Sequence, residues 1–117
     1  MRFLKILRIM PYLLFVSGRR ISELFIPDNF FIKDGQLYIK KIVKKRGNVL
    51  DAGYPIQLID VNPVQFIELY NKFFKMITKQ DGTLMKMETL RKTSSIILKA
   101  DMEMPDFKIK SLRALHV

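Results

Sequence analysis

The chain has 117 residues, enough for a single domain with a modest hydrophobic core. Its 21 Lys and Arg residues outnumber its 11 Asp and Glu residues, and the formal net charge of +10 favours a polyanionic partner, nucleic acid before an anionic membrane surface. The absence of cysteine excludes disulfides and thiolate metal sites, and the single histidine, His116, excludes a histidine-rich cluster, so we expect no metal or other cofactor and an intracellular setting.

The N-terminal segment, Phe3–Val16, predicts a mostly buried helix that Pro11 is expected to kink or divide. Its longest uncharged apolar run, Tyr12–Val16, is too short to span a bilayer. The segment resembles a secretory signal loosely, but Lys5 and Arg8 interrupt its apolar part. We therefore expect neither a cleaved signal nor a membrane partner.

A short second helix is expected directly after the first. Ser17-Gly18 ends the first helix, because glycine tolerates the left-handed conformation common at that position. The second helix covers Arg20–Phe25, and Pro27 ends it near Ile26, since the residue before a proline is disfavoured in helical geometry.

The hydrophobic period then changes to that of strands. Phe30–Lys33 and Gln36–Ile39 flank Asp34-Gly35, a strong signal for a two-residue hairpin turn, and the second strand is expected to continue as far as Val43. A basic turn follows over 44–48, and Tyr54–Ile59 is the expected third strand. These segments predict a small three-stranded antiparallel sheet.

Helix signals return after the sheet. Asn62 is a suitable N-cap with Pro63 at the first helical position, and Asp81-Gly82 is expected to close the helix. The core-facing stripe of this helix repeats at intervals of three and four: Phe66, Leu69, Tyr70, Phe73 and Ile77.

The last part of the chain is also expected to be helical. Leu84–Ala100 predicts a further helix, and Lys108–Val117 begins another after Pro105. The side chains that the first of these offers to the core are Met87, Leu90, Ile97 and Leu98. The expected fold is one α+β domain over 1–117, mainly helical with a small three-stranded antiparallel sheet.

Most enzyme motifs are missing from this sequence. It has no glycine-rich phosphate loop, no Gly-x-Ser-x-Gly motif and no acidic cluster suited to two metal ions. It offers separated basic residues at the edges of secondary elements instead. Such a set suits a phosphodiester, because guanidinium groups bind phosphate oxygens bidentately and neutralise charge in the transition state.

The segment Leu13–Leu24, LLFVSGRRISEL, resembles the first signature box of tyrosine recombinases, the DNA strand-exchange family related to type IB topoisomerases. That box is a hydrophobic helix followed by Thr-Gly-Leu-Arg-Ile-Ser-Glu-Leu. The resemblance implies that Arg20 is the first catalytic arginine and that Glu23 supports the site. Arg19 stands where Leu or Ala is more common and is assigned to DNA binding, and Ser17 replaces Thr.

The same family carries a catalytic lysine in the turn between the second and third strands of its sheet. Lys44 lies at the usual distance from the arginine, with Lys45 as an adjacent competitor. In the family this lysine is the general acid for the leaving 5′ oxygen. The alternative is that Lys44, Lys45 and Arg46 form a solvated turn that contacts the DNA backbone.

The second signature box of the family is usually His-x-Leu-Arg. Here the matching run is Lys110-Ser111-Leu112-Arg113, so the resemblance places the second catalytic arginine on Arg113 and a lysine, Lys110, in place of the histidine. Poxvirus type IB topoisomerases are similar here, with an Ile-Lys-x-Leu-Arg run. Lys108, just before this box, is assigned to DNA binding.

The family's nucleophile, a tyrosine after the second arginine, has no counterpart in this sequence. Each of the four tyrosines precedes Arg113, and His116 is too close to it to match the family's later histidine; the tyrosines are Tyr12, Tyr38, Tyr54 and Tyr70. We therefore expect a partial catalytic domain, without the nucleophile segment or an N-terminal core-binding domain, that is inactive alone.

The resemblance implies DNA integration or site-specific recombination through a 3′-phosphotyrosyl intermediate. The expected partners are double-stranded DNA and further copies of the chain on that DNA, in a prokaryotic cytoplasm, a host nucleus or a viral replication site. The alternatives are a type IB topoisomerase, which Lys110 favours, a degenerate non-catalytic DNA-binding protein and, third, a basic peripheral membrane protein. No segment predicts a DNA target sequence, since phosphate contacts carry no sequence information.

Overall fold

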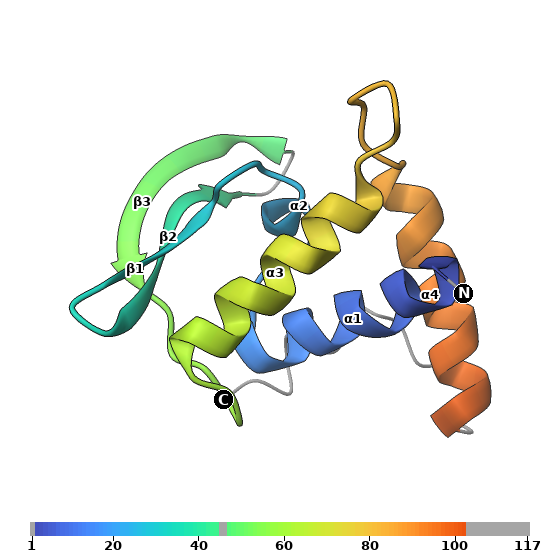
Figure 1. The fold of residues 1–117 in the computed structure, drawn as a ribbon, viewed down its shortest axis with the longest axis horizontal. Coiled ribbons are helices and arrows are strands. Elements are labelled where there is room, and N and C mark those ends of the chain that lie inside the picture. The colour runs from blue at the N-terminus through green and yellow to red at the C-terminus, as the bar shows by residue number, and fades with distance from the viewer. Residues whose placement is uncertain (1, 45–46, 103–117) are drawn as a thin grey trace.

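The computed structural model describes the backbone of residues 2–44 and 47–102 and the side chains of 5–44 and 47–96. Over these residues the chain forms four helices and one three-stranded antiparallel sheet, which confirms the α+β class (Figure 1). The elements are α1 (Arg2–Ser17), α2 (Ile21–Leu24), β1 (Phe30–Lys33), β2 (Gln36–Val43), β3 (Val49–Pro55), α3 (Pro63–Ile77) and α4 (Met87–Met102).

Helix α1 is a single helix that contains Pro11 without being divided by it. Its buried side chains on both sides of the proline, including Ile6 and Leu13, belong to the same core cluster. The helix ends at Ser17, as predicted, and the next residue, Gly18, has φ +67° and donates its backbone N–H to Leu14 O at 2.9 Å. The short α2 then begins at Ile21.

The β1–β2 hairpin confirms the predicted turn and the two strands that flank it. Asp34 and Gly35 both have positive φ, 52° and 75°, as a type I′ turn requires, and Phe30 lies opposite Ile39. The expected third strand, Tyr54–Ile59, was wrong at both ends, because β3 begins at Val49 and ends at Pro55. Nearly all of β3 is exposed, so it has no hydrophobic alternation that could mark its beginning in the sequence.

Helix α3 begins at the predicted cap and ends earlier than expected. Asn62 Oδ1 accepts from Gln65 N at 2.8 Å, and Asn62 N donates to Gln65 Oε1 at 3.0 Å, which is a reciprocal capping box. The helix ends at Ile77, not at Asp81-Gly82, because Thr78 is extended and forms a β-bridge with Leu84. That bridge also moves the start of α4 from Leu84 to Met87.

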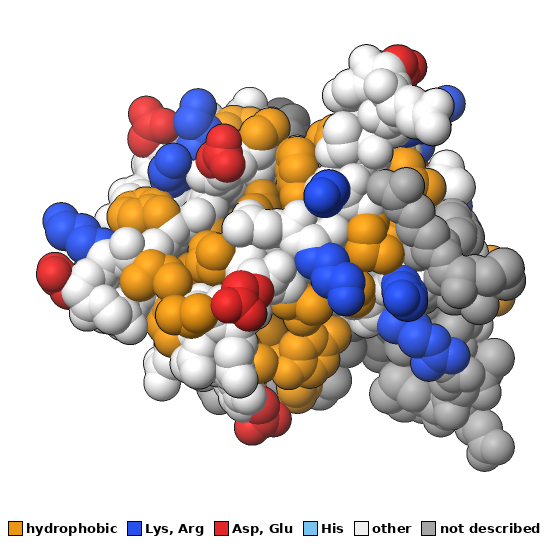
Figure 2. Space-filling view, in the orientation of Figure 1, with side chains coloured by type: hydrophobic (Ala, Val, Ile, Leu, Met, Phe, Trp, Pro, Cys, Tyr) orange, Lys and Arg blue, Asp and Glu red, His pale blue; other side chains and the backbone are white. Residues whose placement is uncertain are grey.

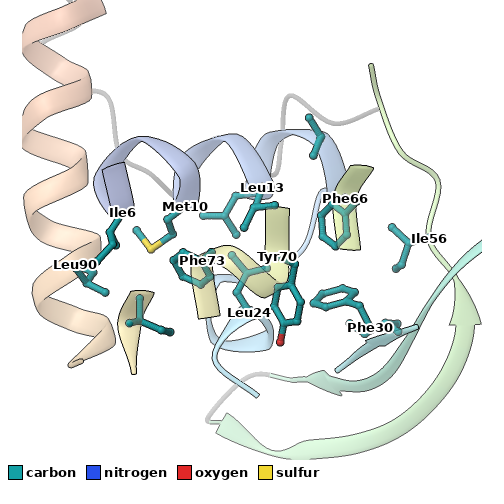
Figure 3. Packing of buried hydrophobic residues seen from close by; sticks show 14 of the residues in the cluster. Ile6, Met10, Leu13, Leu24, Phe30, Ile56, Phe66, Tyr70, Phe73 and Leu90 are labelled. Carbon is teal, nitrogen blue, oxygen red and sulfur yellow. The ribbon is translucent and has the colours of Figure 1, made fainter. Parts of the chain in front are cut away.

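The core lies between α1, α3 and the inner face of the sheet (Figure 3). Phe30 of β1 makes edge-to-face contacts with Phe66 and Tyr70 of α3, with ring centroids 5.2 and 4.9 Å apart. Leu90 of α4 joins the cluster beside Ile6 of α1. The predicted stripe of α3 is confirmed: four of its five residues are buried and Leu69 is partly buried. Ile97, Leu98 and the predicted helix over 108–117 lie outside the described side chains.

Replacing Phe73 by alanine tests this packing. Its side chain is fully buried in the cluster, so Phe73→Ala is expected to lower the free energy of unfolding by about 3–5 kcal/mol, measured by urea denaturation. The control is Val64→Ala on the same helix, where the side chain is 56% exposed and the change is expected to stay within about 0.5 kcal/mol. Equal losses in the two variants would contradict this core.

Candidate functional site

The carboxylate of Glu23 connects α2 to the sheet. Its side chain is 2% exposed; Oε1 accepts from the backbone N–H of Arg20 at 3.0 Å, and Oε2 accepts from that of Val43 at 2.9 Å. One carboxylate therefore holds the residue before α2 and the last residue of β2. Arg20 and the turn that starts at Lys44 are thereby brought to the same end of the sheet, beside α2 (Figure 1).

Asn29 makes a second polar connection between the same two elements. Its Nδ2 donates to Glu23 O at 3.1 Å and to Lys41 O at 2.9 Å, while its Oδ1 accepts from Lys41 N at 2.9 Å. Asn29 is 1% exposed, and its amide is satisfied on both sides, as a buried polar group requires. Sequence reasoning missed this residue, because an asparagine between Asp28 and a strand is an ordinary turn residue.

Arg20 has the features of an available cation. It is the N-cap residue of α2, with an extended backbone (φ −74°, ψ 146°), and its position is fixed by the bond from its N–H to Glu23. Its side chain is half-buried, and among residues 2–44 and 47–102 its guanidinium has no carboxylate or hydrogen-bond partner. An arginine whose backbone is fixed and whose guanidinium is available is suited to bind the phosphate of a ligand.

Arg19, the neighbouring arginine, is engaged within the fold. Its Nη1 donates to the hydroxyl of Tyr54 at 3.0 Å, and its Cζ lies 5.9 Å from the centroid of that ring. Its Nε lies 3.7 Å from Glu23 Oε1 and, within the described residues, has no hydrogen-bond partner although it is buried. The side chain is 13% exposed, so it is less accessible than the sequence assignment to DNA binding implies.

Lys44 occupies the predicted turn between β2 and β3. Its side chain is exposed, and its backbone is fixed by two hydrogen bonds, from its N–H to Asn48 O at 2.8 Å and from Gly47 N to its carbonyl at 3.1 Å. The remaining basic residues assigned from the sequence lie outside the described residues: Lys45, Arg46, Lys108, Lys110 and Arg113. Whether the second arginine joins Arg20 stays a prediction.

The four tyrosines have different environments. Burial raises the pKa of the Tyr70 phenol above its usual value, and its hydroxyl donates to Ile26 O at 2.7 Å, so this tyrosine is part of the core. Tyr38 stacks on Phe31 with centroids 5.4 Å apart, on the sheet face opposite the core. Tyr12 is 41% exposed on α1. Of the four, Tyr54 is the one that contacts an arginine beside Arg20.

A second group of basic residues lies on α1 and α3. Figure 2 shows Lys and Arg side chains gathered over the second half of α3 and the first half of α1. The exposed basic residues of these segments include Lys5, Arg8, Lys72 and Lys75. A hollow of about 750 Å³ near the end of α3 is lined by Lys75 and Lys79 and does not include Arg20 or Glu23.

The described part of the chain has neither a metal-binding cluster nor a membrane-spanning helix. No group of three or more His, Cys, Asp or Glu residues there could hold a metal ion. None of its helices combines the length and the apolar character that crossing a bilayer requires. No protein-family model, curated protein or solved structure matches the chain significantly.

Removing the Glu23 carboxylate should destabilise the fold. Glu23→Ala leaves the backbone N–H groups of Arg20 and Val43 without acceptors, and each costs roughly 1–3 kcal/mol, so the free energy of unfolding should fall by at least about 2 kcal/mol. Urea denaturation measures the loss, with Glu68→Ala on the exposed side of α3 as the control for loss of one carboxylate. A loss no larger than that of the control would show that Glu23 does not connect α2 to the sheet.

Proposed function

We propose that this chain binds the phosphodiester backbone of double-stranded DNA at Arg20, and that it supplies the phosphate-binding part of a tyrosine-recombinase-type strand-cleavage site. The observation that carries the proposal is the arrangement around Glu23. This buried carboxylate fixes the backbone of Arg20 and the end of β2, while the Arg20 guanidinium has no partner in the described part of the chain. The net charge of +10 supports a polyanionic partner.

The proposed chemistry is transfer of a DNA phosphoryl group to a tyrosine. The Arg20 guanidinium binds two non-bridging oxygens of the scissile phosphate and neutralises the charge that develops on them. A tyrosine hydroxyl supplied from outside the assigned residues loses its proton to solvent and forms the new bond to phosphorus, while the bond from phosphorus to the 5′ oxygen breaks. Lys44, on its exposed turn, gives a proton to that leaving oxygen. Arg113 and Lys110 are the proposed further contacts to the phosphate.

Replacing Arg20 by alanine tests the phosphate contact. The expected result is about tenfold weaker binding to a short DNA duplex, the loss of one charge-assisted contact. The slope of log K against log salt should also fall by about 0.9, because one phosphate is no longer neutralised. Fluorescence anisotropy at several salt concentrations measures both quantities.

The matched control is Arg91→Ala, which removes the same charge from an arginine whose guanidinium already binds Glu88 at 2.6 Å. Its effect on DNA affinity should be much smaller. If the two variants weakened DNA binding equally, Arg20 would contribute only its charge and would not make a specific phosphate contact. Binding to anionic vesicles as strong as binding to DNA would contradict a DNA partner.

A suicide DNA substrate tests the missing nucleophile. Such a substrate traps a covalent protein–DNA adduct when a tyrosine attacks the backbone. Incubated with this chain by itself, it is expected to yield no adduct, because Tyr70 is buried and the other three tyrosines precede the proposed phosphate-binding residues of the second box. A covalent adduct on denaturing gels would overturn the proposal that the tyrosine comes from elsewhere.

A further inference from the structure

Tyr54 brings the third strand to the segment that carries Arg20. It lies opposite Ile39 in the register of β2 and β3, on the sheet face that carries the core. From there its hydroxyl accepts a hydrogen bond from Arg19 Nη1, and its ring faces the same guanidinium. The contact joins residues 35 positions apart in the chain. Tyr54 therefore stands beside the proposed phosphate site, although its place in the sequence gives no sign of it.

The direction of this hydrogen bond leaves the O–H of the phenol available to a ligand. A tyrosine hydroxyl has one proton to donate as well as lone pairs to accept with. In Tyr54 the oxygen accepts from Arg19, and its proton has no acceptor among the residues that the structure describes. The side chain is 39% exposed, so a ligand can reach the hydroxyl. The bound guanidinium also polarises the phenol, which strengthens it as a donor.

We propose that the Tyr54 hydroxyl, polarised by Arg19, donates a hydrogen bond to a DNA phosphate next to the one bound by Arg20. The inference rests on the proposed function and adds a residue to that site. Arg19 and Arg20 are consecutive, so their Cα atoms lie about 3.8 Å apart, and one stretch of DNA backbone can pass both residues. Arg19 acts through Tyr54 because its own side chain is largely buried against Glu23 and the ring.

Tyr54→Phe tests this assignment, because it keeps the ring beside Arg19 and removes only the hydroxyl. The expected result is an affinity for duplex DNA about threefold to tenfold weaker, as the loss of one hydrogen bond implies. The slope of log K against log salt should not change, since a neutral hydroxyl releases no counterion. This separates the variant from Arg20→Ala, which lowers both quantities.

The matched control is Tyr38→Phe, on the opposite face of the sheet, where the ring stacks on Phe31. It should leave DNA affinity unchanged. If the contact between Tyr54 and Arg19 is purely structural, Tyr54→Phe should lower the melting temperature but weaken DNA binding no more than Tyr38→Phe does. This result would overturn the inference.

If the unaltered chain shows no salt-dependent binding to duplex DNA, the proposed function itself fails. If Arg20→Ala behaves as expected and Tyr54→Phe matches its control, only the role of Tyr54 fails.

Discussion

The buried carboxylate of Glu23 is the interaction on which the rest of this site depends. Removing an ionised carboxylate from water is costly unless hydrogen bonds and an opposite charge compensate it. Here two backbone N–H groups and the nearby Arg19 guanidinium provide that compensation. The four-residue α2 is too short to be stable alone, so its position is set by this carboxylate and by the Asn29 amide. The backbone of Arg20 is consequently held in a fixed position relative to the end of β2.

In this arrangement the two adjacent arginines have different roles, one structural and one proposed to bind a ligand. Arg19 compensates Glu23 and contacts Tyr54, and its own exposure is small. Arg20 gives only its backbone to the carboxylate, which leaves the guanidinium for a ligand. A neutral residue in place of Arg19 would leave the carboxylate with less compensation, so the unusual Arg-Arg pair has a physical reason within this fold. The proposed DNA contact thus rests on a framework in which the buried charges are largely matched.

Local signals predicted those parts of the fold that depend on neighbours in the sequence. Asp34-Gly35 predicted the hairpin because both positions need positive φ, and Asn62-Pro63 predicted the start of α3 because capping is a local interaction. The roles of the candidate site residues stay predictions. Arg20, Glu23 and Lys44 were identified by resemblance to a family pattern, and the contacts of Glu23 explain how residues 20 positions apart come together.

The sequence by itself determined the α+β class, the order of the elements and the stripe of α3 that enters the core. Each of these depends on the local spacing of hydrophobic residues or on a helix cap. Only the tertiary structure decided where β3 begins and ends and where α3 ends. An exposed edge strand lacks the alternation of hydrophobic and polar residues that marks a strand in a sequence. The bridge from Thr78 to Leu84 ends α3 by pairing residues across a turn. The same holds for Asn29 and for Tyr54 with Arg19, whose partners are set by the packing of distant segments.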